Sequence, residues 1–367
     1  MKAGLLIMGN HAPERSKLQA HQWDLDTIIM GDKMGYEEVW IGEHFAALWE
    51  PLPTAEFIIT QALMKTKRIR LGTGVYLLPF HHPVDLAHRI SYLDHLSQGR
   101  IMIGIGSGAL PVDIRLFNIN YEAGQHREMT REALEVMLFL WQAKGPSQYK
   151  GKYWTVNVPS DDEFAHMKLK INCEPFTKPH PPIAVAAGSP HSQTLKLAGE
   201  RGYIPLTLGL GSAYLASQWD SLEEGARAAG RKPPPRSTWR VVRDVWIDDT
   251  DEKAFKAVRK GMMWRAWTEY LYPVWSSGPQ PIIPSMKHDV SVPDSAVTMN
   301  YILENVWLVG SPDTVARKLR ELYNMAGGFG MILLMVLDHF DDPKGWEKTM
   351  RLFKEEVMPR VADLKPK

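Results

Sequence analysis

The chain has 367 residues, 44% of them hydrophobic, which is enough to bury a large core within one domain. Lysine and arginine (43) nearly balance aspartate and glutamate (42), so charge gives no case for nucleic acid or an anionic membrane as the main partner. The single cysteine, Cys173, excludes an intrachain disulfide, and no apolar run suits a signal peptide or a membrane span, so we expect a cytoplasmic protein.

Apolar runs alternate with amphipathic stretches along the chain. We expect eight strands, at residues 3–8, 38–42, 69–76, 101–105, 183–187, 203–208, 239–247 and 330–337. Helical periodicity is expected at residues 23–34, 54–65, 83–98, 125–142, 192–200, 212–229, 250–263, 312–326 and 346–361. This count favours an α/β fold of the (β/α)₈ TIM-barrel type, with a doubly wound open sheet as the alternative.

Two long segments interrupt the alternation. Residues 144–182, after the fourth strand, carry several prolines, and we expect a hairpin at 149–158. Residues 264–305, after the seventh strand, begin with a crowd of aromatic residues that we expect to wall an apolar pocket. We predict one domain over residues 1–367 that contains both insertions.

Polar and small residues follow the second, third and fourth strands, at the end of a barrel where active sites form. His44 comes directly after the second strand, and histidine is the side chain best suited to proton transfer near neutral pH. The alternative is a histidine that only satisfies a loop. Glycines that would let backbone approach a flat ligand end the next two strands, at Gly72, Gly74, Gly104, Gly106 and Gly108.

Several further motifs carry weaker signals. Gly104-x-Gly106-x-x-Ala109 matches a dinucleotide fingerprint, but a Rossmann loop should follow the first strand and open directly into a helix. After Gly108 we expect instead a loop containing Pro111. No GxSxG elbow appears, which leaves nucleophilic hydrolysis poorly supported.

Two loops before helices invite ligand interpretations. Residues 188–192 precede a helix amino terminus, which either binds a phosphate or is simply capped. His81-His82 suggests a metal, but adjacent histidines point in different directions and Pro83 indicates entry into a helix. We therefore expect no metal site there.

Five separated segments resemble the bacterial luciferase-like flavin monooxygenases. They are GYEEVWIGEHF, RIRLGTGVYLLPFHHPVDLA, HLSQGRIMIGIGSG, VAAGSPHSQTLKLAGERG and VWLVGSPDTVARKL. Within that family the likeness is to the diketocamphane monooxygenases, which are type II Baeyer–Villiger enzymes, and to relatives of the limonene monooxygenase type. This narrower likeness is carried by HLSQGR, AGERGYIPL, RDVWIDDTD, YLYPVW and NVWLVGSPDTV.

The resemblance implies a TIM barrel that binds reduced FMN from a separate NADH-dependent reductase, and it suggests a homodimer. His44 corresponds to the catalytic histidine, and Gly74-Val75 falls where these barrels carry a non-proline cis peptide. The cofactor-binding residues it implies are Thr73, Gly74, Val75, Gly106, Ser107, Gly188, Ser189, His191 and Ser192. We place the substrate against Phe45, Trp264, Trp267 and Tyr270. Asp338 is shared with the family without an assigned role.

The chain also departs from luciferase itself. Phe45 stands where luciferase has a second histidine, no cysteine lies near Gly106, and Ser107 stands in place of the arginine for the phosphate. These differences argue against light emission and leave the group that neutralises the phosphate unassigned, with His191 as the candidate.

We therefore expect a two-component monooxygenase that uses FMNH₂ and O₂, through a C4a-peroxyflavin, to insert one oxygen atom into an apolar ketone, including cyclic ketones, or a terpene-like substrate. The alternatives are a deazaflavin-dependent dehydrogenase on the same barrel, a non-catalytic flavin-binding protein, and a metal-dependent barrel hydrolase.

Overall fold

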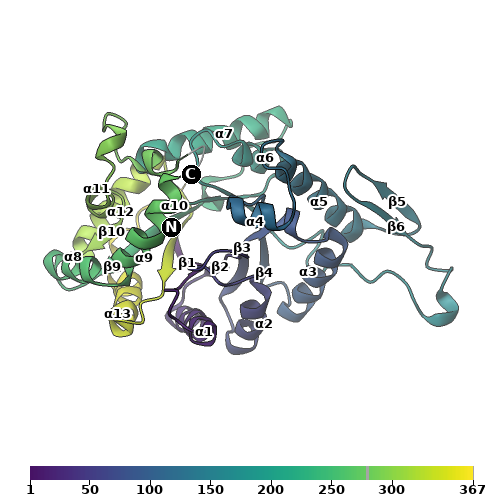
Figure 1. Ribbon diagram of the computed structural model, residues 1–367, viewed down its shortest axis with the longest axis horizontal. Helices are drawn as coiled ribbons and strands as arrows, with labels where there is room; N and C mark the ends of the chain where they lie inside the picture. The colour runs from purple at the N-terminus through teal and green to yellow at the C-terminus, as the bar shows by residue number, and fades with distance from the viewer. Residues whose placement is uncertain (278–280, 367) are drawn as a thin grey trace.

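A computed structural model describes residues 1–277 and 281–366, so three residues of the predicted second insertion, 278–280, lie outside the described residues. Eight parallel strands pair in chain order and close into a barrel between β11 and β1 (Figure 1). The strands are β1 (Lys2–Asn10), β2 (Glu38–Ile41), β3 (Arg70–Leu77), β4 (Ile101–Gly106), β7 (Ile183–Ala187), β8 (Ile204–Thr207), β9 (Arg240–Ile247) and β11 (Met331–Leu337). The predicted TIM barrel is confirmed, and the open sheet is wrong.

Helices cover the outside of the barrel, and their apolar faces pack on the buried strands. They are α1 (Lys17–Met34), α2 (Glu56–Lys65), α3 (Pro83–Ser97), α5 (Gln125–Gln142), α6 (Gln193–Arg201), α7 (Leu215–Ala228), α8 (Asp251–Lys260), α12 (Pro312–Ala326) and α13 (Pro343–Leu352). Helix α13 continues through a π-helical turn, η8 (Phe353–Val357), into α14 (Met358–Arg360). Short 3₁₀ turns are η1 (Leu78–Phe80), η3 (Ser212–Tyr214) and η4 (Arg236–Thr238).

A short extra strand, β10 (Leu308–Gly310), was not predicted. Strand β8 pairs with only the first two residues of β9, Arg240 and Val241. Strand β10 pairs with residues 245–247, at the other end of β9. The apolar run before the α12 cap is therefore a strand beside the barrel rather than a plain connection.

The first insertion contains the predicted hairpin, formed by β5 (Ser147–Lys150) and β6 (Thr155–Val158). Its turn is held to α5 by Glu132, whose carboxylate accepts the main-chain N–H groups of Lys152, Tyr153 and Trp154. The hairpin and the segment after it, with the 3₁₀ turn η2 (Ala165–Met167), project away from the barrel (Figure 1).

The second insertion is largely helical. Its elements are α9 (Met262–Ala266), the π-helical turn η5 (Trp267–Leu271), α10 (Tyr272–Ser276), η6 (Ile283–Met286), η7 (Asp294–Ala296) and α11 (Met299–Asn305). Helix α9 follows α8 almost without a break, so the insertion leaves the barrel at the carboxyl side of β9.

Two helices begin where loops were predicted. Helix α1 starts at Lys17 rather than at residue 23, because Ser16 and Gln19 form a reciprocal capping box at its amino terminus. Helix α4 (Pro111–Leu116) occupies the predicted loop after β4, because Pro111 takes the first helical position, where a missing N–H costs nothing.

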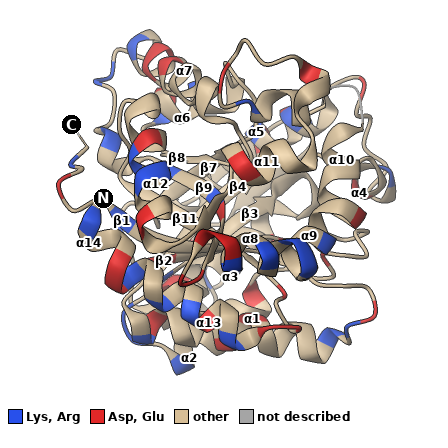
Figure 2. Ribbon diagram, turned by 90° about the vertical axis from the view of Figure 1, so that its left-hand side faces the viewer, with Lys and Arg blue, Asp and Glu red and all other residues tan. Residues whose placement is uncertain are grey.

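Charged residues of both signs are interspersed over the helices and loops on the side drawn in Figure 2, consistent with the near-neutral net charge. None of the helices in the described ranges combines the length and the hydrophobicity needed to cross a membrane.

Candidate functional site

Solvent reaches the barrel at the carboxyl ends of its strands. Elsewhere the strands are almost entirely buried, but five apolar or small residues at these ends are half-buried: Met8, Val75, Gly106, Ala186 and Leu208. The mouth of the barrel therefore presents an apolar floor with little side-chain bulk at Gly106 and Ala186.

Strands β3 and β4 shape this floor. The peptide bond between Gly74 and Val75 is cis, as predicted. Thr73 Oγ1 donates to the Gly104 carbonyl oxygen and accepts from the Gly104 N–H, each at 3.0 Å. A Cβ at Gly106 would lie 2.5 Å from Val75 Cγ2, so a side chain there would displace β4 from β3. The buried Thr73 hydroxyl thus links β3 to β4 and supports the floor, and its contact with the cofactor stays a prediction.

His44 lies at this mouth, in the loop after β2, with 14% of its side chain exposed. Its Nδ1 lies 3.4 Å from Asp113 Oδ2 on α4, and its Nε2 lies 3.3 Å from Glu50 Oε2. Burial alone would lower the pKa of His44, but the carboxylates of Glu50, Asp113 and Glu43 outweigh it and raise that pKa. The imidazole is therefore favoured in its protonated form and can donate a proton to a group in the mouth.

Asp113 also shapes the loop that carries His44. Its Oδ1 accepts the Ala46 N–H at 2.8 Å, which holds the loop after β2 against α4. Glu50 is fixed in a similar way, because Asn10 Nδ2 at the end of β1 donates to Glu50 Oε1 at 2.9 Å.

The adjacent Glu43 serves a structural purpose. Its Oε1 accepts the Leu77 N–H at 2.8 Å and lies 2.6 Å from His81 Nε2, while His82 stands at the N-cap of α3, before Pro83. The interpretation of His81-His82 as a helix entry is confirmed. Among the described residues, no group of three or more His, Cys, Asp or Glu is arranged to hold a metal ion.

The loop between β7 and α6 ends in a capped helix. Ser192 is buried at the N-cap, where its Oγ accepts the Leu195 N–H at 3.4 Å and shares a hydrogen bond of 2.7 Å with Thr194 Oγ1. The preceding His191 is exposed and has a left-handed backbone with φ of +49°. In the same loop, Gly188 is half-buried and Ser189 is exposed, so both are accessible to a ligand. Ser107, which follows β4, is half-buried and is accessible as well.

The four predicted pocket aromatics divide into two groups. Phe45 packs edge-on against Phe80 and Phe117 and is half-buried, as are Trp264 and Tyr270. Trp267 is fully buried, and its indole N–H donates to Asp244 at 2.9 Å. The prediction that Trp267 lines an open pocket is therefore contradicted, because its ring packs instead among other indoles, those of Trp275 and Trp307.

Asp338, at the end of β11, belongs to a buried charge cluster. Its Oδ2 lies 2.7 Å from His11 Nδ1 and 2.7 Å from Arg15 Nε, and His11 Nε2 lies 3.0 Å from Asp24 Oδ2 on α1. The cluster ties the loop after β1 to α1 and β11, which gives Asp338 a structural role.

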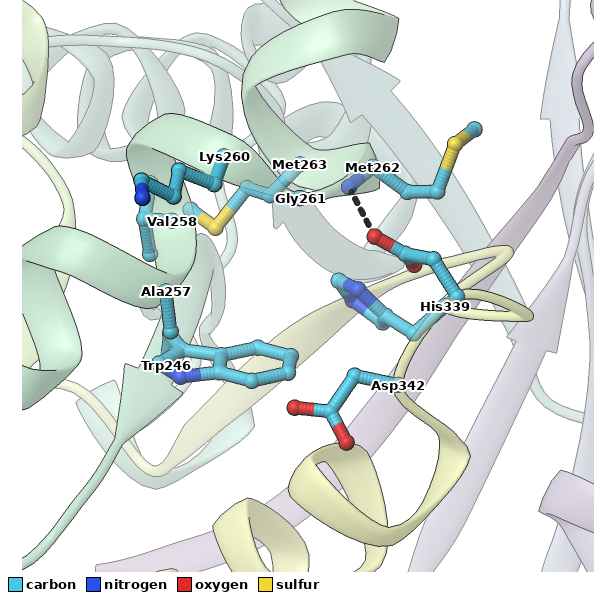
Figure 3. Close-up of a pocket in the computed structure, with 10 residues that line it drawn as sticks. Trp246, Ala257, Val258, Lys260, Gly261, Met262, Met263, His339 and Asp342 are labelled. Atoms are coloured by element: carbon cyan, nitrogen blue, oxygen red, sulfur yellow. Dashed lines mark hydrogen bonds between the residues drawn. The ribbon is translucent and has the colours of Figure 1, made fainter.

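A separate cavity of about 270 Å³ lies between the end of α8, the start of α9 and the loop after β11 (Figure 3). Burial lowers the pKa of His339 in its wall to about 3, so this imidazole is neutral. The Asp341 carboxylate there accepts the Met262 N–H at 3.0 Å. None of the predicted site residues lines this cavity, which therefore lies apart from the site at His44.

Sequence reasoning missed the carboxylates on either side of His44. Asp113 was assigned to a loop, although Pro111 followed by an acid in the first turn is a helix-start signal. Glu50 and Asn10 carry no local motif, because the hydrogen bond that holds Glu50 beside His44 joins residues 40 positions apart in sequence.

Comparisons with known proteins show which family the chain resembles along its length. A family model described as luciferase-like monooxygenase matches residues 1–328. The chain is 31% identical to 3,6-diketocamphane 1,6-monooxygenase of Pseudomonas putida over 98% of both chains, and 28% identical to limonene 1,2-monooxygenase of Rhodococcus erythropolis over 89% of this chain and 78% of that one. The solved oxygenating constituent of P. putida 3,6-diketocamphane monooxygenase, a type II Baeyer–Villiger monooxygenase in complex with FMN, superposes with a TM-score of 0.91 at 33% identity over 100% of both chains.

Proposed function

The chain belongs to the luciferase-like monooxygenase family, and on that premise we propose that it is the oxygenase component of a two-component Baeyer–Villiger system. It is a flavin-dependent monooxygenase whose cofactor is FMN, reduced by a separate NADH-dependent reductase. The proposed substrate is an apolar ketone, cyclic ketones included, or a terpene-like molecule. The observation that carries this proposal is a partly exposed His44 that lies between the carboxylates of Glu50 and Asp113 beside an apolar barrel mouth.

The residues at the mouth fit FMN. A flat ring system suits the floor formed by Gly74, Val75 and Gly106, where a side chain in place of Gly106 would collide with Val75. The first turn of α6 leaves N–H groups without helical partners, next to exposed Ser189 and His191, which suits a phosphate. We assign the ring to the floor together with Ser107, and the phosphate to the loop 188–192, where the exposed His191 imidazole can hydrogen-bond to it. Ser192 contributes by fixing the helix terminus.

The proposed mechanism assigns each residue one task. Bound at this floor, reduced FMN would supply the two electrons with which one atom of O₂ enters the substrate next to the carbonyl and the other is reduced to water. His44 donates its Nε2 proton toward oxygen that gains negative charge during this transfer, and Asp113 keeps the ring oriented through Nδ1. The apolar floor and the half-buried Phe45, Trp264 and Tyr270 keep water away and hold the apolar substrate.

The substrate class is supported by the pocket and by the relatives. The half-buried aromatic side chains Phe45, Trp264 and Tyr270 favour an apolar molecule. The names of the relatives specify diketocamphane and limonene, which are compact cyclic terpenoids. We therefore propose bicyclic ketones as the first substrates to assay.

The test supplies FMN, NADH, a flavin reductase and a bicyclic ketone, and measures the lactone by gas chromatography–mass spectrometry. His44→Gln is expected to lower the rate of lactone formation by about 100-fold or more, which is the usual contribution of a general acid. An exposed histidine on the first insertion, His166→Gln, is the control. Undiminished turnover by His44→Gln, or turnover with a deazaflavin in place of FMN, would refute the proposal, as would flavin binding without an oxygenated product.

We also propose that the protein is a cytoplasmic homodimer. Helices α2 and α3 lie side by side and together carry four largely exposed apolar residues: Phe57, Met64, Tyr92 and Leu96. Such a patch favours a protein interface over open solvent. Light scattering after size exclusion is expected to give a dimer for the wild type and a monomer for Met64→Glu, while Leu18→Glu on α1, equally exposed, stays dimeric.

A further inference from the structure

The Glu50 carboxylate receives contacts from three separate parts of the chain. Oε1 accepts Asn10 Nδ2 at 2.9 Å, and Oε2 accepts the Tyr270 hydroxyl at 2.6 Å. The same Oε2 lies 3.3 Å from His44 Nε2. Glu50 is only 4% exposed, so water competes little for these positions. One buried oxygen therefore serves both the tyrosine and the imidazole.

Tyr270 belongs to residues 262–276, which we call the aromatic segment. Its start is held after β11 by the hydrogen bond from the Met262 N–H to Asp341, and its middle is held to β9 through Trp267. It also reaches the loops after β1 and β2, where Arg265 pairs with Glu14 and Tyr270 stacks on Trp49 with ring centroids 6.1 Å apart. Because these loops all follow the carboxyl ends of strands, the aromatic segment lies across the mouth that holds His44.

We propose that Glu50 and Tyr270 are positioning residues that decide where His44 presents its Nε2 proton. While the Tyr270 hydroxyl donates a hydrogen bond to Glu50 Oε2, that oxygen attracts the His44 Nε2–H less strongly. The Nε2–H can then donate to a ligand instead. When the aromatic segment withdraws Tyr270, Oε2 pairs with His44 alone and holds the proton. The position of the aromatic segment is thereby coupled to the availability of the proton. This inference rests on the proposed function only in making His44 the proton donor.

Because of the charges around His44, two substitutions are expected to shift its titration midpoint in opposite directions. Asp113 on α4, Glu43 and Glu50 face the imidazole, and the Tyr270 phenol remains protonated because burial and Glu50 raise its pKa. Glu50→Gln removes a negative charge beside Nε2, so the titration midpoint of His44 falls. Tyr270→Phe removes the hydrogen bond that partly neutralises Glu50 Oε2, so the titration midpoint of His44 rises. A residue that merely filled space would not produce two shifts of opposite direction.

The experiment titrates the His44 ring by NMR in flavin-free protein labelled with ¹³C at histidine Cε1, with the resonance assigned from His44→Gln. Glu50→Gln is expected to lower the midpoint by about 1 pH unit, the effect of losing one nearby opposite charge, and Tyr270→Phe is expected to raise it. Two matched controls are expected to leave it unchanged. Glu56→Gln removes a carboxylate that accepts the Tyr76 hydroxyl at 2.7 Å, and Tyr272→Phe removes a hydroxyl of the aromatic segment that donates to the Val297 carbonyl at 3.0 Å.

Shifts in the same direction for both variants, or no shift in either, would overturn the inference. If Glu50→Gln does not fold, the comparison of Tyr270→Phe with Tyr272→Phe decides alone. The alkaline limb of kcat against pH, where His44 loses the proton that it donates, should move with each NMR midpoint. Because the titration requires no flavin or ketone, the expected shifts without oxygenation would refute the proposed function alone, whereas oxygenation without the shifts would refute the positioning role alone.

Discussion

The buried cluster around His11 gives a stability prediction that depends on pH. In His11→Gln the side chain keeps hydrogen-bonding capacity but loses the positive charge that lies 2.7 Å from Asp338 and 3.0 Å from Asp24. Although burial alone would lower the pKa of His11, these two carboxylates raise it from 6.5 to about 9. The charged imidazole is therefore part of the folded structure at neutral pH.

The magnitude follows from this pKa. A group whose pKa is raised by folding stabilises the fold fully below its unfolded pKa, and the stabilisation is lost as pH rises through the folded pKa. For His11 that window runs from about pH 6.5 to about pH 9. At about 1.4 kcal/mol for each pKa unit, the contribution is about 3 kcal/mol. Lys318 acts in the opposite sense, because burial lowers its pKa to about 8, so its neutral form favours folding as the pH rises.

The assay therefore compares the free energies of unfolding of the wild type and of His11→Gln. Urea unfolding, followed by tryptophan fluorescence, gives the free energy of unfolding of the wild type and of His11→Gln at pH 6 and at pH 10. The variant is expected to lose about 3 kcal/mol more at pH 6 than at pH 10, since Lys318 contributes equally to both proteins. His166→Gln, at an exposed position, is the control. A loss that is equal at both pH values, or larger at pH 10, would refute the reasoning.

Three further predictions concern the barrel mouth and the cysteine. Thr73→Val is expected to lower the free energy of unfolding by about 2 kcal/mol, because it removes the buried hydroxyl that bonds both the N–H and the carbonyl of Gly104; an unchanged urea midpoint would contradict this. Gly106→Ala places a Cβ 2.5 Å from Val75 Cγ2 and is expected to weaken FMN binding by about tenfold, measured by fluorescence titration; wild-type affinity would argue against the floor as the flavin site. Burial raises the pKa of the Cys173 thiol to about 12, so iodoacetamide at pH 8 should label it only in urea, and rapid labelling of the folded protein would show that the thiol is accessible.

The barrel itself could be predicted because its signals are local. Each of the eight predicted strands overlaps an observed one, and Pro83 after His82 marked the start of α3 correctly. Local signals that were overlooked account for other errors, since the Ser16 capping box gives the start of α1 and Pro111 gives the start of α4. The error at Trp267 has another cause. An aromatic residue in an insertion can face either a ligand or other aromatic residues, and its buried position becomes evident only from its contact with Asp244 in the structure.

The two histidines that follow strands β1 and β2 show why the candidate site could be predicted only in part. His11 and His44 each lie between two carboxylates, and the sequence indicated a role only for His44. His11 is sealed by contacts of 2.7 and 3.0 Å with only 4% of its side chain exposed, so its proton is fixed in place. His44 has looser contacts of 3.3 and 3.4 Å and partial exposure, so a ligand can compete for its proton. Proton transfer requires a donor whose partners can be replaced, and this condition supports the proposal that His44 carries the chemistry while His11 contributes to stability.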